Sequence, residues 1–162
     1  MTGNIRSTAT IAGHPIHPMF VPFPIAFWLA ALVCDAAFAF GADEGWAIAA
    51  FWLLGAGIAF ALLAAVFGFV DFFGEPRIRE LRHAWEHMLG NLAAVTIAAV
   101  SFLLRLTNGP AEAVVPWGLL ASCMVAAVLL FTGWRGADLV YRHATGVRNE
   151  PISSNNKRSA NP

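Results

Sequence analysis

Four long apolar stretches constrain the fold of this sequence more than any other feature. They run approximately over residues 19–40, 46–73, 84–106 and 113–134. An α-helix needs roughly 20 apolar residues to cross about 30 Å of hydrocarbon, and each stretch approaches or exceeds that length. A helix also satisfies its own backbone hydrogen bonds inside lipid. The sequence therefore predicts an all-α integral membrane protein, a bundle of four helices.

Composition supports a membrane location and excludes several other classes. Hydrophobic residues make up 58% of the chain and charged residues 12%, against about 45–50% and about 25% in soluble globular domains. Ten basic and ten acidic residues cancel, so no excess positive charge is available for binding nucleic acid. Cys34 and Cys123 lie in different apolar stretches and are typical of small buried hydrophobes.

Connections and basic residues predict the topology. Short polar links at residues 41–45 and 107–112 require antiparallel neighbouring helices. Nine of the ten Lys and Arg residues lie on one predicted side, and Arg105 is the exception. Basic residues mark the cytoplasmic side. We therefore expect both termini in the cytoplasm and a multi-pass protein of the bacterial inner membrane.

The chain divides into three predicted parts. Residues 1–18 form a cytoplasmic or interfacial segment, residues 19–148 the transmembrane domain, and residues 149–162 a polar, disordered tail. Closely spaced prolines predict an extended segment that becomes a regular helix only after Pro24. A cleaved signal peptide ending near Ala37-Phe38-Ala39 is an alternative interpretation of the first stretch.

All five histidines fall on the predicted cytoplasmic side. His14 and His17 precede the first stretch, His83 and His87 begin the third, and His143 follows the fourth. Asp71 ends the second stretch on the same side, and Asp138 follows the fourth. Histidine is a frequent metal ligand, and ionisable groups within membrane segments mark functional sites. The alternative is that these side chains only bind headgroups, loop amides or one another.

Spacing in the third stretch suggests metal chemistry. His83 and His87 share a helix face, and Asn91 extends that face one turn further. With His17 and Asp71 nearby, they predict a site for a single transition-metal ion. The same residues spell H-x-x-E-H, which in an inverted zincin makes Glu86 a general base, but the sequence offers no further ligand for zinc.

Two charged residues on the other side predict a structural pair. Asp35 lies near the outer end of the first stretch, and Arg105 near the outer end of the third. A carboxylate within the membrane usually takes a basic partner. We therefore expect Asp35 to pair with Arg105.

The sequence resembles the bacterial membrane family called domain of unknown function 2231. The resemblance rests on Gly13-His14-Pro15-Ile16-His17-Pro18-Met19 with Val21-Pro22-Phe23-Pro24-Ile25, on Asp35, Asp71, His87 and Asn91, and on Leu139-Val140-Tyr141-Arg142-His143 with Gly146-Val147. It implies four spans and a histidine-rich cytoplasmic end. Some relatives are joined to Rieske-type or cytochrome modules, which implies a redox setting. The family commonly has glycine where Ala144 stands, and His83 lies outside its pattern.

These observations support a membrane redox or metal-binding protein that is not an enzyme by itself. The expected cofactor is haem b or a single Fe, Cu or Zn ion. The candidate ligands are His14, His17, His87 and His143, and the residues expected to support them are Asn91, Asp138 and Tyr141. A redox partner protein and a homo-oligomer are further expectations. The alternatives are a proton-linked transporter component and a membrane scaffold for a partner protein.

Overall fold

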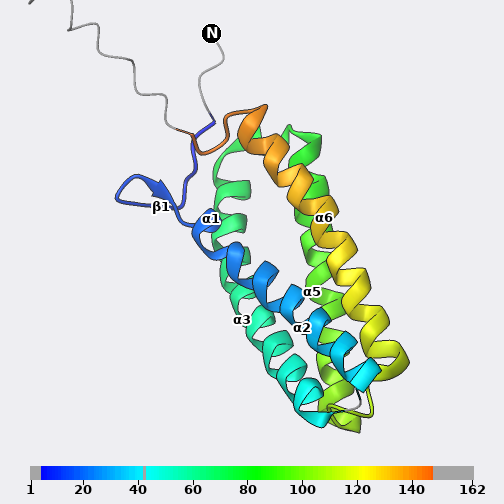
Figure 1. Cartoon of the computed structure of the whole chain (residues 1–162). Helices are drawn as coiled ribbons and strands as arrows, with labels where there is room; N and C mark the ends of the chain where they lie inside the picture. The colour runs from blue at the N-terminus through cyan, green and yellow to red at the C-terminus, as the bar shows by residue number, and fades with distance from the viewer. Residues whose placement is uncertain (1–4, 42, 148–162) are drawn as a thin grey trace, which may run out of the picture.

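Four long helices form the body of the protein. The computed structural model describes residues 5–41 and 43–147. Within them run α2 (Pro22–Gly41), α3 (Glu44–Gly74), α5 (Arg82–Asn108) and α6 (Leu119–Tyr141). Successive long helices run in alternating directions (Figure 1). Four helical segments are long and apolar enough to cross a membrane, which confirms the all-α four-span prediction. The tail predicted at residues 149–162 lies outside the described residues.

Short elements join the long helices. The strands β1 (Thr10–Ile11) and β2 (His14–Pro15) pair as an antiparallel hairpin, with Ile11 opposite His14. It is followed by α1 (His17–Phe20). The segment α4 (Pro76–Arg79) precedes α5, and one irregular turn, η1 (Val114–Gly118), precedes α6.

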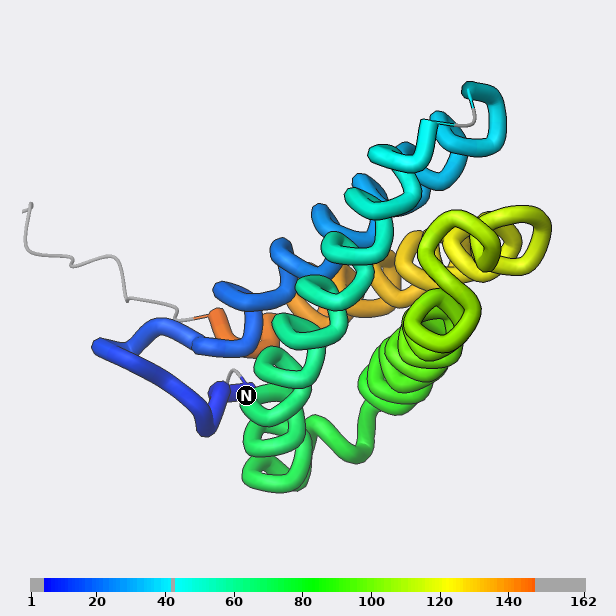
Figure 2. Tube along the Cα trace, turned by 90° about the horizontal axis from the view of Figure 1, so that it is seen from below, coloured from blue at the N-terminus to red at the C-terminus, as the bar shows by residue number. Residues whose placement is uncertain are grey.

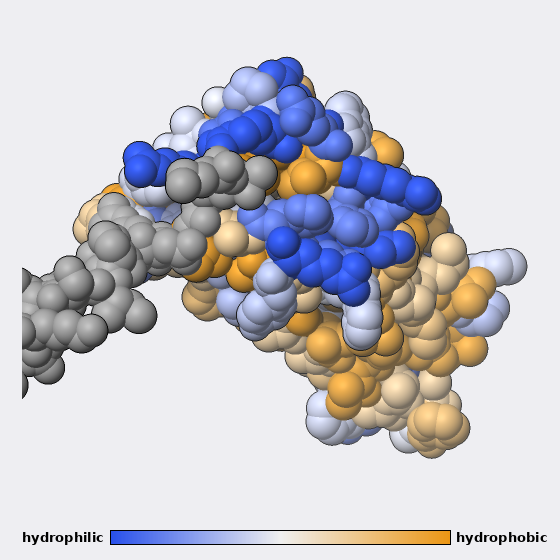
Figure 3. Space-filling view, turned by 90° about the horizontal axis from the view of Figure 1, so that it is seen from above, coloured by the Kyte–Doolittle hydropathy of each residue, from blue (hydrophilic) through white to orange (hydrophobic). Residues whose placement is uncertain are grey.

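Both ends of the described chain meet at one end of the bundle. The amide of Gly146 donates to the carbonyl oxygen of Ile5 at 2.9 Å. The five histidines belong to the same end, which we call the histidine end. Hydrophilic side chains gather on its surface (Figure 3). Polar groups are thus concentrated where the chain enters and leaves the bundle.

The proline-rich segment is helical earlier than expected. Residues 10–15 are extended, but α1 begins at His17 and α2 begins at Pro22, so the prediction of an extended chain up to Pro24 is wrong. Pro18 and Pro22 each occupy the first turn of a helix, where the backbone N–H has no partner within the helix. Prolines therefore start these helices instead of breaking them.

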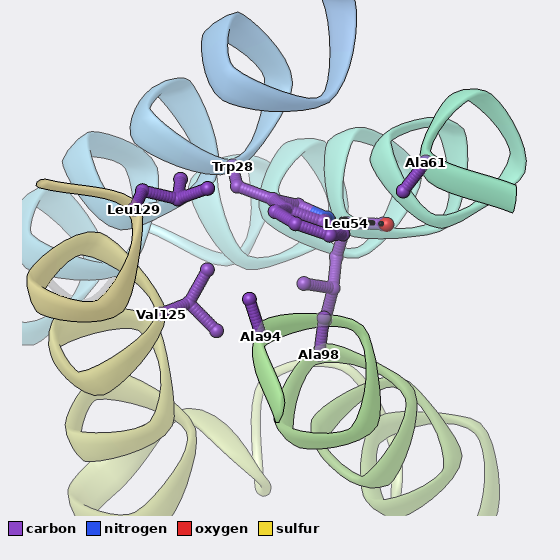
Figure 4. Close-up of a cluster of buried hydrophobic side chains, with 7 residues drawn as sticks. All are labelled: Trp28, Leu54, Ala61, Ala94, Ala98, Val125 and Leu129. Atoms are coloured by element: carbon purple, nitrogen blue, oxygen red, sulfur yellow. Dashed lines mark hydrogen bonds between the residues drawn. The ribbon is translucent and has the colours of Figure 1, made fainter. Parts of the chain in front are cut away.

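The core lies between two helical hairpins. Helix α2 packs mainly on α3, and α5 packs mainly on α6 (Figure 2). Between the hairpins the buried side chains are Trp28, Leu54, Ala61, Ala94, Ala98, Val125 and Leu129 (Figure 4). Trp28 fills the centre and donates from Nε1 to the carbonyl oxygen of Leu54 at 3.3 Å. A Cβ at Gly57 would lie 2.3 Å from that Nε1, so the indole requires glycine there.

Burial repeats along the chain although residue identity does not. In α2 the buried residues are Pro24, Trp28, Ala31, Cys34 and Asp35, and in α5 they are Ala84, Ala94, Ala98, Ser101 and Arg105. Four of the α2 positions recur in α5 with an offset of 70 residues. Four buried positions of α3, Leu54, Gly57, Ala61 and Ala64, likewise recur in α6 as Ser122, Val125, Leu129 and Thr132, with an offset of 68.

The two hairpins are therefore equivalent halves. Helices α2 and α5 run in the same direction, as do α3 and α6 (Figure 1). The contacts between halves match too, because α2 packs against α6 while α5 packs against α3. This is a parallel internal repeat, in which a rotation about an axis along the helices exchanges the halves. Equivalent residues that lie close to that axis can therefore contact one another across it.

Candidate functional site: a histidine pair between the two halves

His17 enters the bundle from the first residue of α1. Its Nδ1 lies 2.8 Å from the carbonyl oxygen of Ala64 in α3. A Cβ added to Gly68 would lie 3.0 Å from the same Nδ1, so the imidazole ring lies directly against the backbone of α3. Ala64 is ten residues from the end of α3, which is about 15 Å along the helix. His17 thus reaches below the rim of the histidine end.

His87 occupies the matching position in the second half. Its Nδ1 lies 2.8 Å from the carbonyl oxygen of Thr132 in α6, and a Cβ at Gly136 would lie 3.0 Å from its Cε1. Thr132 and Gly136 follow Ala64 and Gly68 by 68 residues, and His87 follows His17 by 70. Each half therefore supplies a histidine, a carbonyl acceptor and a glycine in the same arrangement.

The two rings face one another across the halves. Their centroids are 6.3 Å apart, and the ring planes are perpendicular. A carbonyl oxygen can only accept, so Nδ1 carries the proton in both rings. A neutral imidazole protonated on Nδ1 has its lone pair on Nε2. The pair therefore presents two nitrogen lone pairs within the bundle.

Asn91 makes the two histidines unequal. Its Nδ2 donates to His87 Nε2 at 3.1 Å and lies 2.9 Å from the His87 carbonyl oxygen. Its Oδ1 accepts from the Thr132 hydroxyl at 3.2 Å. The equivalent residue of the first half is Val21, which has no side-chain donor. The Nε2 lone pair of His87 is therefore engaged within its own half.

The other candidate histidines lie elsewhere. His14 belongs to β2, is exposed, and contacts the carbonyl oxygen of Ala12 through Nδ1 at 3.1 Å. His83 Nδ1 lies 3.4 Å from His143 Nε2. The structure thus divides the four candidate cofactor ligands, and only His17 and His87 face one another between the halves.

The expected metal set of His17, His83, His87 and Asp71 does not assemble. Among residues 5–41 and 43–147, no three His, Cys, Asp or Glu side chains converge in a way that could hold a metal ion. His83 and His87 share a helix face, but each ring turns to a partner on a different segment. Glu86 binds Arg82 at 2.7 Å and Arg135 at 2.8 Å. The H-x-x-E-H spacing therefore forms no zinc site in this part of the chain.

Asp71 holds the beginning of the described chain. Its carboxylate accepts from the Ser7 hydroxyl at 2.8 Å and from the backbone amides of Thr8 and Ala9 at 2.7 Å each. These are charge-assisted hydrogen bonds, which are stronger than neutral ones. Asp71 therefore fastens the N-terminal segment to the end of α3.

Two of the expected supporting residues do not contact a histidine. Asp138 pairs with Arg142 at 2.9 Å and Arg135 at 3.6 Å. Tyr141 is the last residue of α6, and 86% of its surface is exposed. Asn91 does contact a histidine, as expected. The roles of Gly68, Gly136 and Thr132 beside the histidines could not be predicted from residue types, and the only signal for them is the 68-residue offset in burial.

At the opposite end of the bundle, Asp35 and Arg105 form the predicted pair. Both guanidinium terminal nitrogens donate to the carboxylate at 2.7 Å, and the Ser122 hydroxyl donates to Asp35 Oδ2 at 2.6 Å. The Asp35 and Arg105 side chains are 0% and 1% exposed. They are equivalent residues of the two halves, so this ion pair joins the halves to each other.

Fold and site together define a four-span membrane bundle of two equivalent halves, with one histidine pair shared between them. The family described as "predicted membrane protein (DUF2231)" matches residues 13–149, and the chain belongs to that family. Comparison with curated proteins and with solved structures gives no match. Ala144 has φ = +49°, a conformation that favours glycine.

Proposed function

We propose that this protein binds haem b through His17 and His87 and transfers electrons within the membrane. The observation that carries the proposal is the facing pair of imidazoles, one from each half, with ring centroids 6.3 Å apart. Their Nδ1 atoms are committed to backbone carbonyls, which leaves Nε2 of each ring as the possible ligand. Histidine is a common axial ligand of haem iron.

The separation of the rings supports two ligands on one metal atom. A metal–nitrogen bond of about 2.0–2.1 Å puts the ring centre roughly 3.2 Å from the metal, so two opposed imidazoles have centres roughly 6.4 Å apart. The centroid distance of 6.3 Å agrees with that value.

The number of protein ligands favours haem over a bare ion. A structural zinc ion takes four protein ligands, and a catalytic one takes three. The described residues offer no convergent set of three His, Cys, Asp or Glu side chains. A porphyrin supplies four nitrogens of its own, so two histidines complete the coordination of its iron. Bound haem would supply reversible one-electron oxidation and reduction.

The surrounding residues would support this role. The carbonyls of Ala64 and Thr132 fix the orientation of each ring and increase the basicity of Nε2. Gly68 and Gly136 leave room for the rings against the helices. Asn91 must release His87 Nε2, and its Nδ2 still has the His87 carbonyl oxygen at 2.9 Å as an acceptor. Haem binding by both histidines would therefore require this one hydrogen bond to open.

The membrane side and the partner complete the proposal. We propose that the histidine end faces the cytoplasm of a bacterium, the side that the distribution of Lys and Arg predicts. A haem held by His17 and His87 would lie nearer to that end than to the Asp35–Arg105 pair, within reach of a redox partner protein on the cytoplasmic side. Bundle cores are common sites for cofactors of this kind.

Absorption spectroscopy tests the proposal directly. The protein is expressed with added haem precursor, purified in detergent, and measured before and after dithionite, with iron determined by elemental analysis. We expect a Soret band that shifts on reduction and about one iron per chain, the stoichiometry of one haem held by two histidines. His17→Ala and His87→Ala should each lose the band.

The matched control is His14→Ala, because His14 is an exposed histidine of the same end. It should keep the full Soret absorbance. Absence of both the Soret band and stoichiometric iron from the wild-type protein would overturn the proposal. So would an unchanged spectrum in His17→Ala and His87→Ala protein that elutes as a folded species.

A further inference from the structure

A second histidine pair lies at the rim of the histidine end. His83 is the second residue of α5, and His143 lies two residues beyond the end of α6. The Nδ1 of His83 and the Nε2 of His143 are 3.4 Å apart, and the ring centroids are 5.6 Å apart at an interplanar angle of 43°. Both side chains are half-buried, so ions in solution can reach them.

This pair does not belong to the symmetric site. The positions equivalent to His83 and His143 in the first half are Gly13 and Glu75, by the offsets of 70 and 68 residues. The rings of His17 and His87 contact each other instead. The rim pair is therefore a feature of the second half alone, and its role must be argued separately.

The distance between the two nitrogens suits a shared metal ion better than a hydrogen bond. Hydrogen bonds to nitrogen donors in proteins peak near 2.9–3.0 Å, and 3.4 Å is beyond their usual range. Two nitrogens bound to one tetrahedral ion at about 2.0–2.1 Å lie about 3.3–3.4 Å from each other. The separation of His83 Nδ1 and His143 Nε2 equals that ligand spacing.

The backbone holds His143 in place. The amide of Thr145 donates to the Leu139 carbonyl oxygen at 3.1 Å and closes a turn around His143. Within that turn Ala144 has φ = +49°, a conformation that costs free energy for a residue with a Cβ. Two residues after Ala144, the amide of Gly146 donates to the carbonyl oxygen of Ile5. The turn therefore contains a strained residue, and it positions His143 beside α5.

We propose that His83 and His143 bind one divalent transition-metal ion at the surface of the histidine end. The ion would be bound through His83 Nδ1 and His143 Nε2, and water would complete its coordination. Imidazole ligands suit Zn²⁺, Cu²⁺ and Ni²⁺. No third His, Cys, Asp or Glu converges on the pair within the part of the chain that the structure describes. Two protein ligands are fewer than the three or four of a catalytic or structural zinc site, so this would be a weak, exchangeable site completed by water.

Zinc titration tests this site without haem. The full chain is purified in detergent with an affinity tag that contains no histidine, and Zn²⁺ is titrated in competition with a chromophoric chelator. We expect one zinc per chain and at least a tenfold weaker affinity in His83→Gln and in His143→Gln. His14→Gln is the matched control, because it removes an exposed histidine of the same end, and it should bind as the wild type does.

Thermal unfolding gives a second readout. An ion that binds only the folded protein raises its unfolding temperature. Excess Zn²⁺ should raise it for the wild type and for His14→Gln, but not for His83→Gln or His143→Gln. Failure of the wild type to bind zinc would overturn the proposal, as would equal zinc affinity in the two rim variants. Neither outcome bears on the Soret test of His17 and His87.

Discussion

Each end of the bundle brings together two polar residues from equivalent positions of the two halves. At one end the residues are identical, His17 and His87, and at the other they are opposite in charge, Asp35 and Arg105. The ion pair forms two hydrogen bonds at 2.7 Å, and both side chains are buried. Within the described residues, the two histidines form no hydrogen bond with each other, and each ring binds the backbone of its own half.

In this repeated architecture, one end of the bundle stabilises the packing of the two halves, and the other is the end where we propose binding. Opposite charges at equivalent positions satisfy one another, so the pair can lock the halves together inside a membrane. Two identical imidazoles do not satisfy one another in this way, and the Nε2 of His87 accepts a hydrogen bond from Asn91 instead. The end with the ion pair is therefore complete, and the histidine end is the one where we propose that a ligand binds.

Breaking the ion pair should have the largest effect. Arg105→Met leaves the Asp35 carboxylate buried without its cation, and we expect a loss of about 3–5 kcal/mol in the free energy of unfolding. Unfolding in detergent, followed by circular dichroism, measures it. The double variant Asp35→Leu with Arg105→Met removes both charges and should lose less than Arg105→Met alone. A double variant that is no more stable than Arg105→Met would contradict the pairing energy assigned to these residues.

Releasing the N-terminal segment should have the next largest effect, and a local one. Asp71→Asn removes the charge that accepts hydrogen bonds from Ser7, Thr8 and Ala9, which we expect to cost about 1.5–3 kcal/mol locally. Hydrogen exchange of the Thr8 and Ala9 amides should become faster, while exchange in the helical core stays unchanged. Ser7→Ala, which removes one neutral donor, should cause a smaller increase. Unchanged exchange at Thr8 in Asp71→Asn protein would sink this prediction.

Making the two histidines equivalent should have a smaller effect on stability, and it should change haem affinity in the opposite direction. Asn91→Val gives the second half the residue that the first half has at Val21, and it removes the hydrogen bond to His87 Nε2. We expect a loss of about 1 kcal/mol in stability. Haem affinity should rise, because the lone pair of His87 is no longer engaged. Titration with haemin measures it, and a fall as large as that in His87→Ala would assign Asn91 a direct role in binding.

An exposed ion pair provides the smallest expected effect. The hydrogen bond from the Arg77 side chain holds the pKa of Glu75 below its usual range. Because the pKa is lowered in the folded state, the stabilisation is present above the pKa of unfolded glutamate and is lost as pH falls through the folded value. Arg77 is exposed, so water and salt screen the pair and no change in unfolding temperature is expected.

Carboxyl NMR titration between about pH 3 and 7 follows the Glu75 pKa directly, in the range where glutamate titrates. The pKa should rise in Arg77→Gln. It should also rise in the wild type as salt is added. An equal Glu75 pKa in the wild type and in Arg77→Gln would show that Arg77 does not cause the shift.

Much of the fold could be predicted from the sequence because a membrane limits the backbone structures that a chain can adopt within it. The length of each apolar stretch led to a spanning helix, and scarcity of charge within the stretches left Asp35 and Arg105 as natural partners. Proline was misread, since its position in the first turn of α1 and α2 depends on where each helix starts. A four-residue spacing was misread too, because it puts His83 and His87 on one face without fixing where either ring points.

The sequence by itself determined that this chain forms four apolar helices and that its histidines gather at one end, because hydropathy, helix length and alternating direction are properties of the chain. Only the tertiary structure decided which histidines meet. His17 and His87 face one another because the two halves pack as equivalents, and His83 turns instead to His143. The equivalence of the halves is visible in which positions are buried. Burial arises from packing, and few equivalent positions have the same residue.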